Sequence, residues 1–478
     1  MPTPDYAMSR AANAGHAPAM EWAGTGALST ARLDPRYSLV SKGVGLVVFL
    51  LAPLWISALF FAGDYEYSSA IGLIPLLVLL NIGLVLGVSR RDPFLRITML
   101  AATVLKVAGA GMALLVSFRV YETGADALHY FTVGQNLANG FWARGEWPLM
   151  LPLWSTTLIN TLSAYLVMII GPSIPALFVL FAFFALWGGY FFYRAFCLAF
   201  PNGNRGAAAL LLFFLPSIVY WTACIGKDAV IALFLGIAAY GFAKMRLRPG
   251  ARSYLVLGAG LLGVMAIRPH VAAMLGVSLV IPYLLARNRR GLVGGLYKVA
   301  GLLILGAGSA FLVSQAQDFL QISDFKKAST TIENITSKTR LGGSAFGQTS
   351  SLPARAAMAP FLLFRPLPWE AHNLQSAIAS LEGLALLFLL WRNRNGVLRL
   401  VRRWRANTYV LFIVLFAGEF CITFSAAASN FGTLSRMRVM LLPFALMLLC
   451  APPAVAHAAV RPGQVRRRFR RAPLTETR

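Results

Sequence analysis

The sequence predicts an all-α integral membrane protein whose chain crosses the bilayer many times. Of its 478 residues, 58% are apolar and only 13% are charged, whereas soluble domains average about 45–50% apolar and roughly 25% charged residues. The apolar residues form runs whose length is close to the about 20 residues that a helix needs to cross a bilayer. Most arginines flank these runs, as the positive-inside rule predicts. Together these observations exclude a soluble enzyme and a disordered protein.

The net charge of +26, from 43 Lys and Arg against 17 Asp and Glu, sets the topology and favours contact with anionic lipid headgroups. Because no basic module with interleaved aromatic residues is present, we expect no nucleic-acid partner. The four cysteines have no CxxC spacing, which indicates small buried hydrophobic residues rather than a disulfide framework or a zinc site.

The chain divides into a flexible cytosolic tail at 1–42, a membrane domain at 43–458 and a basic cytosolic tail at 459–478. We expect about twelve transmembrane helices in the membrane domain. The predicted spans are 43–62, 70–88, 97–118, 174–193, 207–224, 229–245, 253–267, 271–286, 295–314, 375–391, 408–426 and 437–458.

The apolar run 151–170 is long enough to be a thirteenth span, and charge decides against it. Basic residues place the loops 89–96 and 244–252 inside, so 119–150 and the corner at 171–173 must both lie outside. Both conditions hold only if 151–170 does not cross. We therefore expect an interfacial helix on the outer surface and both termini in the cytosol.

With this topology, polar residues of varied type collect on the outer face, including a long extracytoplasmic loop at 315–374. Ionisable residues at membrane depth are costly and usually functional. A loop of this length is also more than a connector. The sequence therefore predicts a functional site at the outer interface.

The stretch Ala125-Asp126-Ala127-Leu128-His129-Tyr130 follows a predicted span directly. It leads through Trp147-Pro148 and Pro152-Leu153-Trp154 into the predicted surface helix. This layout resembles that of GT-C glycosyltransferases, which are polytopic membrane enzymes similar to protein O-mannosyltransferases and lipid A aminoarabinose transferases. The resemblance covers about 97–245. Two predicted spans precede it here, whereas the family pattern usually begins with the span before the Asp.

The resemblance implies that Asp126 is the general base that takes the proton of an acceptor hydroxyl, and that Asp228 is a second catalytic carboxylate. It assigns His129 and Tyr130 to the sugar or acceptor. Lys227 suits the phosphate of a lipid-linked donor. The residues alone also permit a plainer interpretation, in which both aspartates lie at helix N-termini as caps and Lys227 snorkels to the interface.

Three arginines on the outer face oppose the usual charge bias, and a phosphate partner would explain them. They are Arg268, in the turn Ile267-Arg268-Pro269-His270, and Arg436 and Arg438, before the last span. A turn that merely tolerates one Arg is the alternative for Arg268.

The second part of the long loop is rich in groups that bind sugars and phosphates. Arg365 suits a phosphate, and Trp369, Glu370, His372 and Asn373 suit a sugar or acceptor. The alternative is that Trp369 only anchors the loop at the interface.

These residues predict a bacterial inner-membrane glycosyltransferase with a polyprenyl-phosphate-linked sugar as donor and an envelope glycan, lipid or protein as acceptor. A Wzy-like polysaccharide polymerase or O-antigen ligase is the first alternative, and a lipid or solute flippase or transporter is the second. The sequence shows no certain cofactor. Some GT-C members use a divalent cation, which Asp126 and Asp228 would help to hold, and the sequence does not decide this.

Overall fold

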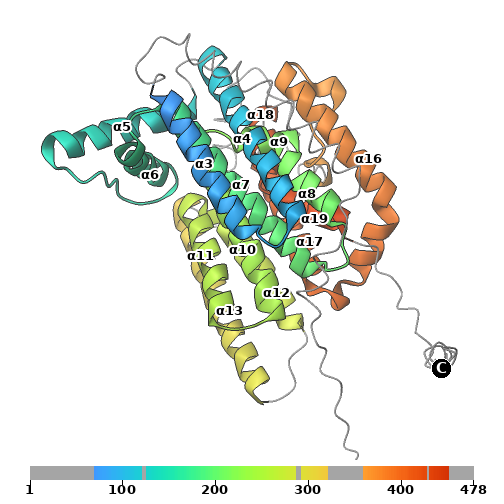
Figure 1. Ribbon diagram of the computed structural model, residues 1–478. Helices are drawn as coiled ribbons and strands as arrows, with labels where there is room; N and C mark the ends of the chain where they lie inside the picture. The colour runs from blue at the N-terminus through green and yellow to red at the C-terminus, as the bar shows by residue number, and fades with distance from the viewer. Residues whose placement is uncertain (1–68, 121–124, 287–291, 321–358, 428–429, 452–478) are drawn as a thin grey trace, which may run out of the picture.

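The computed structural model describes residues 69–120, 125–286, 292–320, 359–427 and 430–451, and every regular element in these ranges is a helix (Figure 1). The helices are α3 Ala70–Val88, α4 Pro93–Arg119, α5 Asp126–Arg144, α6 Ser155–Ile170, α7 Ile174–Ala199, α8 Arg205–Phe214, α9 Pro216–Trp221, α10 Lys227–Leu247, α11 Ala251–Ile267, α12 Pro269–Leu285, α13 Leu292–Leu320, η2 Ala359–Phe361, η3 Pro368–Glu370, α16 Leu374–Arg402, η4 Trp404–Ala406, α17 Thr408–Ala427, α18 Phe431–Arg438 and α19 Leu442–Cys450. The predicted all-α class is confirmed. The predicted tails, the span 43–62 and most of the loop 315–374 lie outside the described residues.

Six helices in the described ranges are long and apolar enough to cross a membrane, namely α3, α4, α7, α10, α16 and α17. The pair α18 and α19 adds a seventh candidate if its two helices, bent by 55° relative to each other, form one span. Helices α6, α8, α11 and α12 are apolar but have only 10–17 residues. The chain is therefore a helical multi-pass membrane protein, and the count of twelve crossings stays a prediction.

Two predicted spans are broken helices in the structure. The predicted span 207–224 consists of α8 and α9, which meet at Leu215 and Pro216. Proline has no N–H to donate and its ring clashes with the preceding turn, so a helix cannot continue through it unbroken. The predicted span 437–458 includes the last two residues of the short helix α18 and the whole of α19, which are separate helices.

Helices α7 and α10 run parallel, which fixes the two ends of the bundle. The side chain of Asn407 donates to the carbonyl oxygen of Ala199 at 2.8 Å and accepts from Arg246 at 2.7 Å. The last turns of α7 and α10 therefore meet beside Asn407, and both helices begin at the opposite end. The 21 residues of α10 extend for about 30 Å at roughly 1.5 Å per residue, close to the thickness of a bilayer core.

Small residues allow α7 and α10 to approach closely. A Cβ atom at Gly236 would collide with the backbone carbonyl of Gly188, which is the small-residue packing common between membrane helices. A polar chain joins α3, α4 and α7. Asn81 donates to Thr103 at 2.9 Å and accepts from the indole of Trp187 at 3.0 Å.

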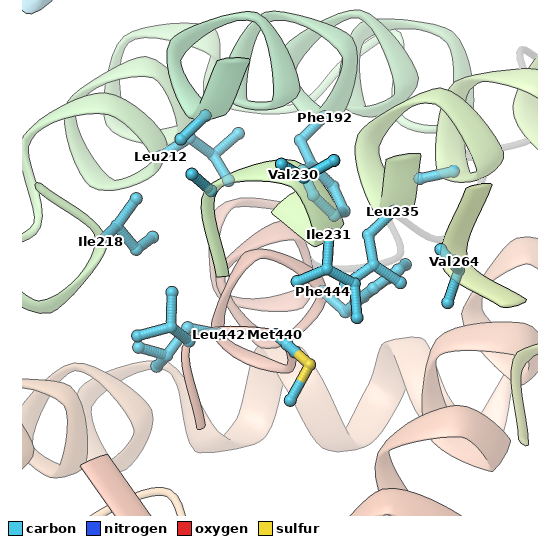
Figure 2. Close-up of a cluster of buried hydrophobic side chains, with 14 of the residues drawn as sticks. Phe192, Leu212, Ile218, Val230, Ile231, Leu235, Val264, Met440, Leu442 and Phe444 are labelled. Atoms are coloured by element: carbon cyan, nitrogen blue, oxygen red, sulfur yellow. The ribbon is translucent and has the colours of Figure 1, made fainter. Parts of the chain in front are cut away.

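The apolar core lies where α7 to α11 meet the last two helices. Figure 2 shows that it contains the buried side chains of Phe192, Leu212, Ile218, Val230, Ile231, Leu235, Val264, Met440, Leu442 and Phe444. Val230 and Ile231 follow Asp228 within one turn of α10. The start of α10 is therefore the edge of the core, where apolar packing gives way to charged groups.

Helices α5 and α6 pack on each other as a pair, and α5 runs across the direction of α3 and α4 (Figure 1). The two helices pack tightly at Gly134, where a Cβ atom would lie 2.7 Å from the Cβ of Ser163. The start of α5 and the start of α6 lie at the same end of the bundle as the start of α10.

Candidate functional site

Arg436 joins two aspartates that are far apart in the sequence. Its Nη1 donates to Asp126 Oδ2 at 2.8 Å, and its Nε donates to Asp228 Oδ2. The Asp126 side chain is 60% exposed, whereas that of Asp228 is only 3% exposed. One carboxylate is therefore open to a ligand while the other is held inside the protein.

Arg268 is the second cation at Asp228, and its Nη2 donates to Asp228 Oδ1 at 2.9 Å. Both oxygens of Asp228 are thus bonded to guanidinium groups. Hydrogen bonds between charged groups are shorter and stronger than neutral ones, so this buried carboxylate fixes the positions of Arg268 and Arg436. In this arrangement Asp228 positions the two arginines, and the expectation that it is also a catalytic carboxylate stays a prediction.

Lys227 lies beside this group and is held by a neutral partner. Its Nζ donates to Thr156 Oγ1 at 2.9 Å. Within the described ranges, no carboxylate lies within ion-pair distance of Lys227. Three cations, Lys227, Arg268 and Arg436, therefore face two carboxylates, and the cluster has one surplus positive charge that would attract an anion.

Tyr130 lies in the same neighbourhood, where burial and the charge of Asp126 raise its pKa to about 12. The phenol is therefore protonated at neutral pH. Its side chain is only 4% exposed, and its ring packs against Gly226, where a Cβ atom would be 3.5 Å away. The structure thus uses Tyr130 to support the turn before Lys227, while His129 is exposed.

Neither aspartate caps its helix, although each lies in a first turn. The N-cap residues are Ala125 for α5 and Gly226 for α10, and neither helix has a side-chain cap. The plainer interpretation of Asp126 and Asp228 as N-caps is therefore wrong. A carboxylate in a first turn is still a favourable neighbour of the positive end of the helix dipole.

Lys106 supports the turn that carries Lys227. Its Nζ reaches from α4 to the carbonyl oxygen of Ile218 at 2.9 Å and the hydroxyl of Thr222 at 2.6 Å. These groups belong to the end of α9 and the residue after it. Lys106 therefore has a structural role, because it ties α4 to α9 and to the segment between α9 and α10.

Arg438 lies two residues after Arg436 but points elsewhere. Its side chain is 0% exposed and forms a 3.0 Å ion pair with Glu382, which is 3% exposed. It also donates to Ser217 Oγ and to the carbonyl oxygen of Arg365. This placement corrects the expectation that Arg438 binds a donor phosphate, because the guanidinium is enclosed by protein.

The sugar-binding candidates at 365–373 form a separate group. Arg365 pairs with Glu370, and its guanidinium lies 5.1 Å from the ring centre of Phe431, the first residue of α18. Trp369 and His372 are exposed. This group makes polar contacts within itself and with α16 and α18.

Asn373 has a structural role, and its predicted contact with a sugar or acceptor stays a prediction. Its side chain accepts from the backbone N–H of Ser376 at 2.8 Å and caps α16. An Asn in this position stabilises the first turn of the helix, and its carbonyl oxygen is occupied.

A divalent cation does not fit the two aspartates as they lie. Arg436 occupies the space between Asp126 and Asp228 where such an ion would bind. In the described part of the chain, no group of three or more His, Cys, Asp or Glu side chains gathers in one place.

Sequence reasoning missed Thr156, the partner of Lys227, and Ser217, a partner of Arg438. Thr156 is part of Ser155-Thr156-Thr157 at the start of α6, and such a run is typical of a helix N-terminus. Its contact with Lys227 joins residues 71 positions apart, and no local pattern reports such a contact.

A small cavity borders Asp228 and Arg436 on the core side. Its other lining residues are apolar, and they are Phe192, Ala232, Leu235, Val439, Met440 and Pro443. These neighbours lower the local dielectric and strengthen the ion pairs at Asp228. Comparisons of the chain with protein-family models, curated proteins and solved structures find no match.

Proposed function

We propose that the protein is a membrane glycosyltransferase that moves a sugar from a polyprenyl-phosphate-linked donor to a hydroxyl group of a cell-envelope glycan, lipid or protein. The observation that supports the proposal is that Asp126 and Asp228 both form ion pairs with Arg436. It combines an exposed carboxylate with a surplus positive charge at one end of the bundle. A sugar transfer from a phosphate requires both, a base for the acceptor and cations for the leaving group.

Asp126 is the proposed general base. Its carboxylate removes the proton from the acceptor hydroxyl as the oxygen attacks the anomeric carbon of the donor sugar. The bond between the anomeric carbon and the phosphate oxygen breaks, and polyprenyl phosphate leaves with the electron pair. The side chain is 60% exposed, so an acceptor can reach it.

Lys227 and Arg436 are the proposed partners of the leaving phosphate. The ammonium of Lys227 has further donors besides the one given to Thr156. Arg268 stays on Asp228 and keeps Arg436 in place through the shared carboxylate. Preorganised charges of this kind stabilise a transition state because they need no rearrangement during the reaction.

The membrane arrangement belongs to the same proposal. We infer that α10 begins at the extracytoplasmic face and that α5 and α6 lie along that face without crossing, with both termini in the cytosol of a bacterial cell. The contacts Asp126–Arg436 and Lys227–Thr156 support this because they bring the starts of α5, α6 and α10 together. Polyprenyl-linked donors suit that face, where nucleotide sugars are not available.

The test compares Asp126→Asn with Glu146→Gln in purified protein reconstituted in nanodiscs. Glu146 is a matched control, because its carboxylate also pairs with an arginine and is 61% exposed. With a panel of polyprenyl-phosphate sugars and a native envelope extract as acceptor, we expect Asp126→Asn to slow transfer by about 10²-fold or more, and Glu146→Gln to retain the wild-type rate. Full activity of Asp126→Asn would contradict the mechanism, and no transfer by the wild type would contradict the function.

Product length separates this activity from a Wzy-like polymerase. Arg436 contacts both aspartates, so loss of activity in Arg436→Ala is expected for either enzyme and does not distinguish them. A single added sugar supports a glycosyltransferase, whereas a ladder of repeating units from a polyprenyl-pyrophosphate donor supports a polymerase.

A further inference from the structure

The contact between Thr156 and Lys227 connects the pair of helices α5 and α6 to the start of α10. The Lys227 Nζ lies 2.9 Å from Thr156 Oγ1. A lysine side chain has four rotatable bonds and is not oriented by its own shape. The threonine hydroxyl accepts one hydrogen bond and leaves the charge of the ammonium intact. A carboxylate in its place would neutralise the charge that an anion has to meet.

Thr156 directly follows a residue with an unusual backbone conformation. Ser155, the first residue of α6, has a φ of 50°. This left-handed region is unfavourable for a residue with a Cβ atom and persists only where the surroundings enforce it. Such strained residues cluster at functional sites. Here the strain lies directly before the hydroxyl that contacts Lys227.

The surroundings of α6 account for how the strain is maintained. On one side, the hydroxyl of Thr157 bonds with the backbone of Trp154 and closes the turn before the helix. On the other, α6 packs on α5 at Gly134, which leaves no room for a Cβ atom. Contacts just before α6 and contacts within it therefore fix the start of the helix. Thr156 thus has a defined position relative to α10.

We propose that Thr156 is a positioning residue that aims the ammonium of Lys227 at the phosphate of a polyprenyl-phosphate donor or product. The proposal rests on the proposed function for the identity of the ligand. Thr156 acts through Lys227 and does not touch the reacting atoms. Its removal therefore weakens phosphate binding and raises the KM for the donor more than it lowers kcat.

The experiment measures binding of undecaprenyl monophosphate to the full-length protein in phosphatidylcholine nanodiscs. The variants are Thr156→Val, which keeps the shape and loses the hydroxyl, and Thr156→Ser, which keeps the hydroxyl. We expect Thr156→Val to weaken binding by about three- to tenfold, as for one lost hydrogen bond, and Thr156→Ser to stay within about twofold of the wild type. If Thr156→Val is not recovered folded, Thr156→Ala makes the same comparison.

A double-mutant cycle with Lys227→Met tests whether Thr156 acts through Lys227. In the Lys227→Met background, Thr156→Val should cause no further loss of binding. An equal loss in both backgrounds would overturn the proposal, and so would unchanged binding in Thr156→Val alone.

This readout separates the inference from the proposed function, because binding requires no sugar transfer. If the wild type transfers no sugar but the cycle behaves as expected, Thr156 has its role and the enzyme assignment fails. If transfer occurs and Thr156→Val binds and reacts as the wild type does, the enzyme assignment stands and the role of Thr156 is refuted.

Discussion

Arg438 and Glu382 form an ion pair of 3.0 Å in which neither side chain is more than 3% exposed. The pair joins α18 to α16, and both partners have further hydrogen bonds. Glu382 accepts from the backbone N–H of Ser217 at 2.7 Å, at the start of α9. Three helices thus depend on two buried charges.

Removing one partner of this pair should destabilise the protein strongly. We expect Glu382→Gln and Arg438→Met each to lower the free energy of unfolding by about 3 kcal/mol, because a buried charge is left without its counter-charge. In the double variant the loss should be smaller than the sum of the two. Thermal unfolding in detergent, read by tryptophan fluorescence, measures these changes. Additive losses would show that the pair itself contributes nothing.

The contact between α7 and α10 predicts a marked difference between two glycine substitutions. In Gly236→Ala the new methyl group meets the backbone carbonyl of Gly188, which cannot move aside as a side chain can. We expect a loss of about 1–3 kcal/mol from overpacking. Gly258→Ala, in α11, is the control because nothing lies within 4 Å of its Cβ position. Equal melting temperatures for the two variants would contradict the close packing.

The backbone at Ser155 predicts a stabilising substitution. Glycine adopts a positive φ without the steric cost that a Cβ atom brings. We therefore expect Ser155→Gly to be more stable than Ser155→Ala by about 1 kcal/mol. Both variants lack the hydroxyl, so their difference in melting temperature reports the backbone alone. A less stable glycine variant would show that Ser155 does not have the left-handed conformation.

The proposed topology predicts which introduced cysteines react from outside the cell. Trp147, between α5 and α6, is 71% exposed, and Arg394 is exposed near the other end of the bundle. In intact cells, a membrane-impermeant maleimide should label Trp147→Cys but label Arg394→Cys only after permeabilisation. The variants are made in a background in which the four native cysteines are serine. The reverse pattern would place the aspartate cluster in the cytosol.

The sequence predicted the helical class and most helix positions because apolar runs and their basic flanks are local signals. The predicted span 70–88 coincides with α3, and 253–267 differs from α11 by two residues at its start. Charge counting also placed Asp126, Lys227 and Asp228 on one face, and the structure brings them together. Breaks within spans were missed, although Pro216 carried the signal for one of them.

The partners of the charged residues could not be predicted, because they depend on contacts between distant elements. Arg436 and Arg438 appeared equivalent in the sequence. In the structure both lie in the helix α18, which points their side chains in different directions. Residues two positions apart in a helix are about 200° apart around its axis. One arginine therefore faces the aspartates and the other faces Glu382, and only knowledge of α18 would have separated their roles.

The eight residues of α18 contact two groups of candidate site residues. Through Arg436 the helix holds the start of α5, and through Arg438 it holds the backbone of Leu363 and Arg365. A ligand that drew Arg436 away from Asp126 would rotate or shift helix α18. Because Arg438 of the same helix is bonded to the backbone of Arg365, the segment around Arg365 would move with it. We therefore expect a ligand at the aspartates to change the arrangement of the exposed Trp369 and His372.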